Sequence, residues 1–301
     1  MIDAGGRGGF SLLSGLNPHI QLYSFEPDKA SFGELNEIIA HSGFHSAEIF
    51  PIALSDSNSK AQFFRTQHPS MSSLLAPDHD RFFASYNAVR HNEEWAAKMK
   101  VEEKTEVETR TLSSFLEEKN IGAVDLLKLD TQGAELKILK GADRFLRAKN
   151  FGLIFTEVLF IPTYKEHPVF SEIDSLLREC GYRFIDLRIY PEVLDKENSI
   201  SISGKMMERP KYCVGGDAVY IPEFSANDDT EKIKRTALLL TNLGYYSDSK
   251  HLLKTFCRMN ENEAEVFQKN FAAENSRKRF KRFLQRWTPP AIANLYSRMK
   301  K

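Results

Sequence analysis

The chain begins with an acidic residue followed by closely spaced glycines, in the order M-I-D-A-G-G-R-G-G-F. An apolar residue followed by Asp3, Gly5 and Gly8 is typical of a strand that ends in a tight turn before a helix. The glycines let the backbone approach a ligand, and the helix N-terminus offers it unpaired N–H groups. Glu26 ends a second apolar run, where nucleoside-binding folds place a carboxylate against ribose hydroxyls. The pattern therefore predicts an α/β fold that binds a nucleoside.

The glycine spacing separates two classes of cofactor. A dinucleotide fingerprint needs G-x-G-x-x-G, but the pattern that starts at Gly6 reaches Gly8 and then Ser11. The chain instead has D-x-G-x-x-G, in which Asp3 would repel a pyrophosphate. S-adenosylmethionine has an ammonium group and no phosphate, so it is compatible with this acid. An NAD-dependent oxidoreductase is the disfavoured alternative, and an ordinary strand-to-helix turn stays open on the motif alone.

The length and composition are those of a globular protein. The 301 residues suit one large domain, or one domain with an extension. No apolar stretch reaches the ~18 residues of a membrane span, and no signal peptide is visible. The cysteines Cys180, Cys213 and Cys257 form no C-x-x-C pair. We therefore expect reduced thiols and a cytoplasmic protein.

The net charge of zero hides a basic C-terminal tail. Residues 275–301 contain nine Lys or Arg and no Asp or Glu, so the rest of the chain is acidic overall. Four apolar side chains in this tail fall on one face of a predicted helix: Phe280, Phe283, Leu284 and Trp287. A solvated or oligomer-packing helix and a peripheral membrane helix at 277–301 both remain open. Nucleic acid is not an expected partner, because the body is acidic and no recognition motif accompanies the tail. No oligomeric state is predicted.

Apolar runs alternate with helical patterns, which predicts a mostly parallel sheet built from βαβ units. We expect strands at residues 1–3, 20–25, 48–54, 61–65, 107–110, 123–129, 153–158, 182–187 and 217–221. We expect helices at residues 9–17, 28–41, 111–119, 133–141 and 171–180. Because the first strand is shorter than the ~5 residues usual for a buried strand, we expect the domain to begin upstream of Met1.

Two segments depart from this alternation. Residues 66–104 are polar with interspersed aromatics, and we interpret them as an insertion that serves either as a lid over the acceptor or as a peripheral flap. Residues 225–301 have an all-helical pattern. We therefore expect one domain at 1–224 and a helical extension at 225–301.

Acidic residues stand at successive predicted strand ends: Asp3, Glu26, Asp56, Asp130 and Glu157. A single acid at such a place is often only a helix N-cap. In an open parallel sheet, however, ligands bind at the carboxyl ends of the strands. The recurrence of acids there predicts one ligand site along that edge.

At this point the chain resembles the FkbM-type family of S-adenosylmethionine-dependent methyltransferases. The matching segments are I-D-A-G-G-R-G-G-F (2–10), F-E-P (25–27), A-L-S-D (53–56), V-E-T-R-T-L (107–112), D-L-L-K-L-D-T-Q-G-A-E-L-K-I-L-K-G-A (125–142), T-E-V (156–158) and G-D-A-V-Y (216–220). They occur in the order of the family, over about residues 1 to 222. The segment K-L-D-T-Q-G-A-E is the most specific of them.

The resemblance implies a Rossmann-like seven-stranded sheet whose last strand runs antiparallel, and methyl transfer to an oxygen of a sugar, polyketide or similar small molecule. The positions that it implies for S-adenosylmethionine are Asp3, Gly5 and Gly8 at the amino-acid end, Glu26 at the ribose, Asp56 near the adenine and Asp130 near the methyl group. The chain departs from the family at its short first strand, at Gln132, where an acid is more usual, and at Ser113, where Asp is frequent.

A hydroxyl acceptor must lose a proton, so a positioned base would contribute to the reaction. We consider Asp130 first, then Glu157 and Glu135, and His68 on the insertion as a fourth candidate. Glu135 has a simpler interpretation as an acid in the first turn of a helix, where it favours the helix dipole. Asp130, Glu135 and Glu157 could alternatively form a divalent metal site, although we predict none.

The leading hypothesis is an S-adenosylmethionine-dependent O-methyltransferase (an EC 2.1.1 enzyme) that acts on a small molecule or glycan. A non-catalytic scaffold that keeps the fold is the alternative from a different class. No H-E-x-x-H, G-x-S-x-G or P-loop pattern indicates another chemistry.

Overall fold

The structure is a computed structural model that describes residues 1–8, 13, 15–81, 92–192, 200–202, 205–207 and 212–271. The chain divides into two compact units. One contains Met1–Phe10 and His19–Glu223, and the other contains Ser11–Pro18 and Phe224–Lys301. Each unit is described by itself.

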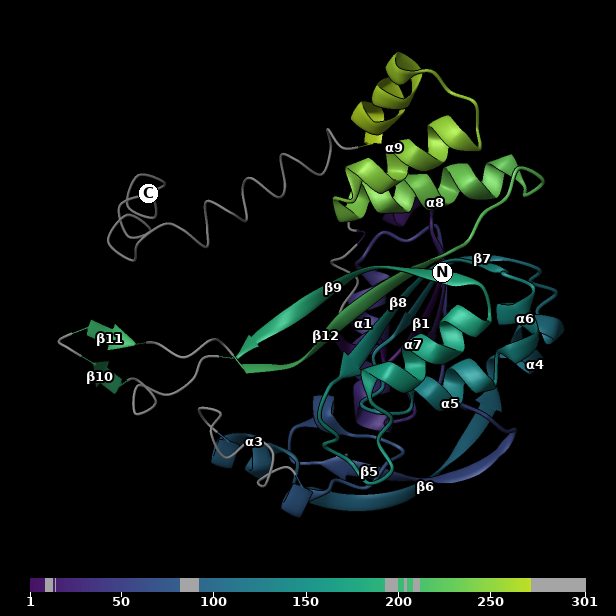
Figure 1. The fold of residues 1–301 in the computed structure, drawn as a ribbon. Coiled ribbons are helices and arrows are strands. Elements are labelled where there is room, and N and C mark those ends of the chain that lie inside the picture. Colours follow the sequence, from purple (N-terminus) through teal and green to yellow (C-terminus); the bar gives the residue numbers. More distant parts are fainter. Residues whose placement is uncertain are drawn as a thin grey trace, which may run out of the picture. The chain divides into compact units, whose positions relative to one another are not determined.

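The first unit is built on a seven-stranded sheet with the order β3-β2-β1-β7-β8-β12-β9 (Figure 1). Its strands are β1 (Ile2–Ala4), β2 (Gln21–Phe25), β3 (Ser46–Phe50), β7 (Val124–Leu129), β8 (Phe151–Leu159), β9 (Tyr182–Glu192) and β12 (Tyr212–Pro222). The first five of these pair in parallel, whereas β12 runs antiparallel to both β8 and β9. The predicted fold class, including an antiparallel last strand, is confirmed.

A second, three-stranded sheet has the order β4-β6-β5. Its strands are β4 (Ala53–Ser55), β5 (Ser59–Thr66) and β6 (Val101–Thr111). The strands β10 (Ile200–Ile202) and β11 (Lys205–Met207) form a separate two-stranded antiparallel sheet. The helices of this unit are η1 (Gly6–Gly8), α1 (Lys29–Ala40), η4 (Pro69–Met71), α3 (Asn92–Lys98), α4 (Leu112–Glu118), α5 (Glu135–Lys140), α6 (Asp143–Arg147) and α7 (Phe170–Glu179).

The alternation of side chains along β2 explains why helices cover both faces of the sheet. Tyr23 and Phe25 are buried in the main core, which also contains side chains of α4, α5, α6 and α7. Leu22 points to the opposite face and packs with Leu35 and Ile39 of α1. Because successive side chains of a strand point to opposite faces, each face of β2 packs against a different layer of helices.

Side-chain caps mark two helix starts that the sequence predicted closely. Asp28 precedes α1, and its carboxylate accepts the backbone N–H of Ser31 at 3.0 Å. Thr111 precedes α4, and its hydroxyl oxygen accepts the N–H of Ser114 at 3.2 Å. These bonds satisfy backbone donors that have no partner within the first helical turn.

Two predicted strands had wrong boundaries. The strand expected at 48–54 is two strands in different sheets, because the chain bends at Pro51, which has no N–H for a ladder. The strand expected at 107–110 begins at Val101, inside the predicted insertion. Its first residues are mostly charged and exposed, so they carry no apolar alternation.

Two other predictions fall largely outside the described residues. Most of the helix expected at 9–17 falls on residues 9–12 and 14, which lie outside the described residues. Its last residue, Asn17, begins the 3-10 turn η3 (Asn17–His19). The basic tail at 277–301 lies beyond residue 271. Its membrane contact stays a prediction.

The second unit is helical where it is described. It contains α8 (Thr230–Leu243), α9 (Tyr246–Thr255) and a helical segment at 261–271. Gly244 ends α8 in the left-handed region at φ 93°, which lets the chain turn directly into α9. Within the described residues, no helix has the length and apolar character needed to cross a bilayer.

Gly5 is required by the packing of two central strands rather than by a ligand alone. It has φ 80°, and a Cβ atom on it would lie 1.7 Å from the carbonyl oxygen of Asp130. The backbone bond from Asp130 N–H to the Ala4 carbonyl, at 3.0 Å, holds the two strand ends at this separation. A side chain cannot be accommodated there without parting β1 from β7.

We expect Gly5→Ala to lower the free energy of unfolding by more than about 3 kcal/mol, because both the clash and the left-handed φ oppose it. Gly33→Ala is the control. Gly33 is exposed within α1 and has open space around it, so the change should stabilise the protein by about 1 kcal/mol. Urea unfolding measures both. Equal stabilities for Gly5→Ala and the wild type would contradict this account.

Candidate functional site

A cavity of about 390 Å³ lies at the carboxyl ends of β1, β2, β7 and β8. The strand ends contribute Gly5, Glu26, Asp130 and Glu157 to its wall. This is the edge at which parallel α/β sheets bind their ligands. Of the acids predicted at strand ends, three therefore line a common pocket.

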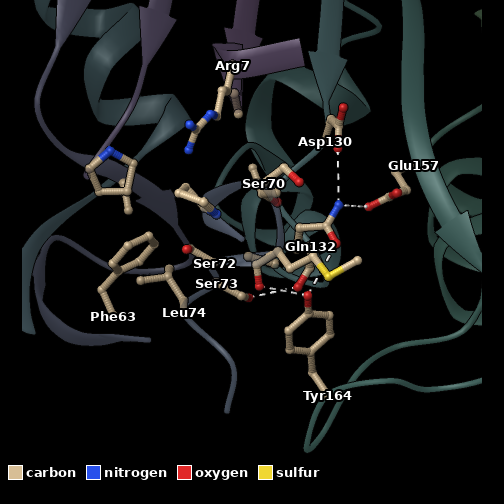
Figure 2. A pocket seen from close by; sticks show the side chains of 18 of the residues that line it. Arg7, Phe63, Ser70, Ser72, Ser73, Leu74, Asp130, Gln132, Glu157 and Tyr164 are labelled. Carbon is tan, nitrogen blue, oxygen red and sulfur yellow. Dashed lines mark hydrogen bonds between the residues drawn. The ribbon is translucent and has the colours of Figure 1, made fainter. Parts of the chain in front are cut away.

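The opposite wall comes from the segment predicted as an insertion, together with the strand before it. Its lining residues include Phe63, Pro69, Ser70, Met71, Ser72, Ser73, Leu74, Trp95 and Met99. Figure 2 shows Phe63 and Leu74 on the far side of the view from Asp130 and Glu157, with Ser70 and Ser72 between them. The wall combines apolar surface with serine hydroxyls. A lid over the acceptor must line the cavity, and residues of the segment 66–104 do so. Their role as a lid stays a prediction.

A buried ion pair stands beneath the pocket. Lys128 Nζ lies 3.1 Å from Asp3 Oδ1 and 3.6 Å from Asp130 Oδ2. Burial acts to lower the pKa of Lys128, but the charges of Asp3 and Asp130 outweigh it and raise that pKa above its ordinary value. Burial raises the pKa of Asp3, against the opposing effect of Lys128. The pair sits at register partners of β1 and β7, so it joins the two strands directly.

Glu26 lies at the end of β2 and is nearly buried. Its Oε1 accepts the backbone N–H of Asp28 at 2.9 Å. Burial raises its pKa to about 7, despite that bond. Nearby, Arg7 of η1 lines the pocket and is held by Ser31 Oγ at 3.0 Å and Glu34 Oε2 at 3.2 Å.

Gln132 lies between the other two carboxylates of the pocket (Figure 2). Its Nε2 donates to Glu157 Oε2 at 2.9 Å and lies 3.4 Å from Asp130 Oδ1. Burial raises the pKa of Glu157 well above its ordinary value, and the negative charges of Asp130, Glu135 and Asp217 raise it further. The pocket floor therefore presents two carboxyl groups with different surroundings.

The carboxylate of Glu135 is fully engaged by the turn that precedes α5. It accepts Thr131 N at 2.6 Å, Thr131 Oγ1 at 2.9 Å and Gly133 N at 2.8 Å. Glu135 is 2 % exposed and does not line the cavity. The geometry favours its interpretation as an acid that stabilises a helix start.

The family of the chain is shown by its match to a protein-family model. The model of the methyltransferase FkbM domain matches residues 8–184. The chain belongs to the FkbM methyltransferase family. The resemblance noted in the sequence is thereby confirmed.

Named relatives of the chain are methyltransferases. It is 29% identical over 142 residues to "2-O-methyltransferase NoeI" of Sinorhizobium fredii, covering 47% of this chain and 55% of that protein. It is 31% identical over 147 residues to "Methyltransferase 1" of Beauveria bassiana, covering 48% and 58%. It is 25% identical over 194 residues to "Methyltransferase sdnD" of Sordaria araneosa, covering 60% and 73%. The match thus spans little more than half the length of the first two relatives.

The remaining predicted site residues of this FkbM-family chain lie around the pocket rather than in its wall. Asp3 is buried behind it, Gly8 ends η1, and Asp56 is exposed after β4 with its Oδ1 3.2 Å from Ser55 Oγ. His68 is exposed, and its Nδ1 lies 2.6 Å from Ser70 Oγ. Their proposed contacts with a cofactor or acceptor stay predictions. In the part of the chain that the structure describes, no group of three or more His, Cys, Asp or Glu is placed to hold a metal ion.

Sequence reasoning missed several pocket residues, above all Tyr164 and the serines at 70, 72 and 73. Tyr164 is buried in the irregular segment after β8, and its hydroxyl donates to the Met71 carbonyl at 2.9 Å and to Gln132 Oε1 at 3.2 Å. No periodic pattern marks these positions. Arg7, by contrast, stands inside the glycine motif and could have been found as a cation at the pocket mouth.

We expect Lys128→Met to lower the free energy of unfolding by about 3–5 kcal/mol at neutral pH, because it leaves Asp3 buried without its counter-charge. A buried acid with a raised pKa costs folding free energy as the pH rises, so this loss should shrink when the pH is lowered from about 7 to about 4. The double variant Asp3→Asn with Lys128→Met removes both charges and should be more stable than Lys128→Met alone. A double-mutant cycle by urea unfolding would contradict the ion pair if the two changes were additive.

Proposed function

We propose that this FkbM-family chain is an S-adenosylmethionine-dependent O-methyltransferase that acts on a hydroxyl group of a sugar, glycan or secondary metabolite. The observation that carries the proposal is that one cavity contains both Glu26, suited to a ribose, and the paired carboxyl groups of Asp130 and Glu157, suited to a hydroxyl acceptor. The family supplies the reaction class.

The residues present fit the cofactor. Glu26 provides a carboxylate for the ribose hydroxyls, and the apolar residues Ala53 and Leu54 line the same cavity, where a flat base could pack. Beneath the glycine turn, Asp3 Oδ2 is buried without a hydrogen-bond partner among the described residues. A Cβ on Gly6 would approach this oxygen to 3.1 Å, so negative charge lies directly below the turn. Because Lys128 already pairs with Oδ1 of Asp3, what the turn offers is a free acceptor oxygen, which favours a hydrogen-bond donor such as an ammonium group and disfavours the acceptor oxygens of a pyrophosphate.

When bound, S-adenosylmethionine supplies a methyl group on a sulfonium, which is already a good leaving group. The protein must orient the acceptor oxygen, exclude water and accept a proton. Asp130, beside the ammonium of Lys128, is the carboxylate that receives the hydroxyl proton at an Oδ atom. Glu157, with its raised pKa, holds a proton and donates a hydrogen bond to a neighbouring acceptor oxygen. Glu135 acts indirectly, since it holds the turn that carries Gln132.

The acceptor class follows from the wall opposite these acids. Ser70 and Ser72 offer hydroxyl groups, and Trp95 offers an aromatic surface of the kind that packs on sugar faces. One relative is named a 2-O-methyltransferase, which supports an oxygen acceptor. The segment 66–104 is therefore proposed to position the acceptor and to shield it from water.

We expect wild-type protein to bind S-adenosylmethionine and Glu26→Ala to bind it at least about tenfold more weakly, because charge-assisted bonds to the ribose are lost. Isothermal titration calorimetry measures both. Glu37→Ala, on the exposed face of α1, is the matched control and should bind as the wild type does. No binding by the wild type would favour the scaffold alternative instead.

The affinity should depend on pH through Glu26. Because its pKa is raised to about 7, its ionised form, the better acceptor of hydroxyl hydrogen bonds, increases roughly tenfold between about pH 6 and about pH 8. We expect the dissociation constant to fall by up to the same factor. Glu26→Gln cannot ionise and should show a weaker dependence. An unchanged dependence in Glu26→Gln would assign the titration to another group.

Methyl transfer itself is tested with a radiolabelled methyl donor and a panel of mono- and oligosaccharides. We expect transfer to a hydroxyl acceptor, and Asp130→Asn should lower kcat by about 10²- to 10⁴-fold because the general base is lost. The affinity for S-adenosylmethionine should change less than kcat in this variant. Equal kcat values for Asp130→Asn and the wild type would exclude Asp130 as the base.

A further inference from the structure

The turn that carries Gln132 is held in place from two sides. Gln132 has φ 58°, an uncommon conformation for a residue other than glycine. The Glu135 carboxylate accepts three hydrogen bonds from Thr131 and Gly133 on one side of it. On the other side, Ser73 Oγ donates to the Gln132 carbonyl oxygen at 2.7 Å. Such a conformation persists where the surroundings over-determine it, which is frequent at functional sites.

The side chain of Gln132 uses both ends of its amide. One nitrogen with two N–H groups can donate to two acceptors, and here it faces Glu157 Oε2 at 2.9 Å and Asp130 Oδ1 at 3.4 Å. The amide oxygen lies 3.2 Å from the hydroxyl of Tyr164, whose single proton it shares with the Met71 carbonyl at 2.9 Å. The reverse orientation would set the amide oxygen against two carboxyl groups, so the network determines how the amide points.

The two carboxyl groups meet at one amide nitrogen, and burial together with the negative charge of Asp130 raises the pKa of Glu157. The charged groups around the pair are arranged unequally, with Lys128 of β7 close to Asp130 and the acids Glu135 of α5 and Asp217 of β12 acting on Glu157. The amide is the group that contacts both members.

We propose that Gln132 is a positioning residue: its amide holds Asp130 and Glu157 in fixed relation at the cavity floor, and it connects both to the opposite wall through Tyr164 and Ser73 (Figure 2). The pocket then presents two carboxyl groups to a hydroxyl ligand, with their relative position set by one amide. This role rests on the proposed function only in taking the cavity as the place where the acceptor hydroxyl binds.

Gln132 is connected to the segment 69–74 in two ways: its side chain through Tyr164, which contacts the Met71 carbonyl, and its backbone carbonyl through Ser73. Tyr164 also donates to the carbonyl of Met71, and Ser73 follows directly after Ser72, which lines the cavity. A change in the segment 69–74 therefore reaches the amide through two hydrogen bonds. The Gln132 amide thus links the position of the segment 69–74 to the positions of the Asp130 and Glu157 carboxyl groups.

The test is a carboxyl titration followed by NMR on full-length, ligand-free protein labelled with ¹³C in Glu and Asp side chains. Glu157→Gln identifies the Glu157 signal. Gln132→Met keeps the length of the side chain and removes both N–H donors, so the apparent pKa of Glu157 should rise by about one pH unit or more. A purely structural role would lower the melting temperature and leave this titration where it is in the wild type.

Two further variants keep the test decisive if Gln132→Met does not fold. Tyr164→Phe removes only the hydroxyl that orients the amide, and it should move the Glu157 titration in the same direction by a smaller amount. Gln62→Met, at an exposed position of β5, is the matched control and should leave the titration unchanged. Unchanged Glu157 titrations in Gln132→Met and Tyr164→Phe would overturn the proposal.

The outcome is separate from that of the proposed function. Calorimetry with S-adenosylmethionine is carried out on the same wild-type sample. A shifted Glu157 titration in the variants, together with no cofactor binding by the wild type, would leave the role of Gln132 standing and remove the methyltransferase assignment. Cofactor binding without any titration shift would remove the role of Gln132 alone.

Discussion

The buried ion pair between Lys128 and Asp3 is the contact on which the geometry of the pocket depends. It joins β7 to β1 at register partners, and the same ammonium lies 3.6 Å from Asp130. Because both strands end within one or two residues of this pair, their carboxyl ends are held at a separation that leaves no room for a side chain on Gly5. A buried pair of charges contributes little to net stability, but removing one member is costly. The pair therefore serves chiefly to fix where the strand ends, and with them Asp130, are placed.

The parts of the fold that the sequence predicted are those with regular apolar periodicity or a recognisable cap. The strands β2, β7 and β8 are buried on both faces, so they appear as apolar runs, and Asp28 and Thr111 mark the starts of α1 and α4. The site was predicted through the same logic. Acids at the ends of neighbouring parallel strands must lie along one edge, and Glu26, Asp130 and Glu157 do so.

What the sequence could not predict depends on contacts that are distant along the chain. The first half of β6 has exposed, charged side chains, so no apolar alternation shows that it pairs with β5. The wall formed by residues 69–74 comes close to Gln132 only through hydrogen bonds from Ser73 and Tyr164, which are separated from it by 59 and 32 residues. For Glu135 the sequence identified the position but not the role of the side chain. Its position in the motif was recognised, but whether its carboxylate faces a ligand or the backbone is decided by the turn around it.

Gln132 gives the clearest reason why a departure from the family pattern need not weaken the site. A third acid at this position would face two carboxyl groups within hydrogen-bonding distance, in surroundings where the pKa of Glu157 is already raised. An amide brings two donors and no charge. Lys128 lies beside Asp130, whereas the charges of Glu135 and Asp217 raise the pKa of Glu157, so the two carboxyl groups differ although they share one neighbour. For the proposed proton transfer from a hydroxyl group, that difference matters more than a further negative charge at position 132 would.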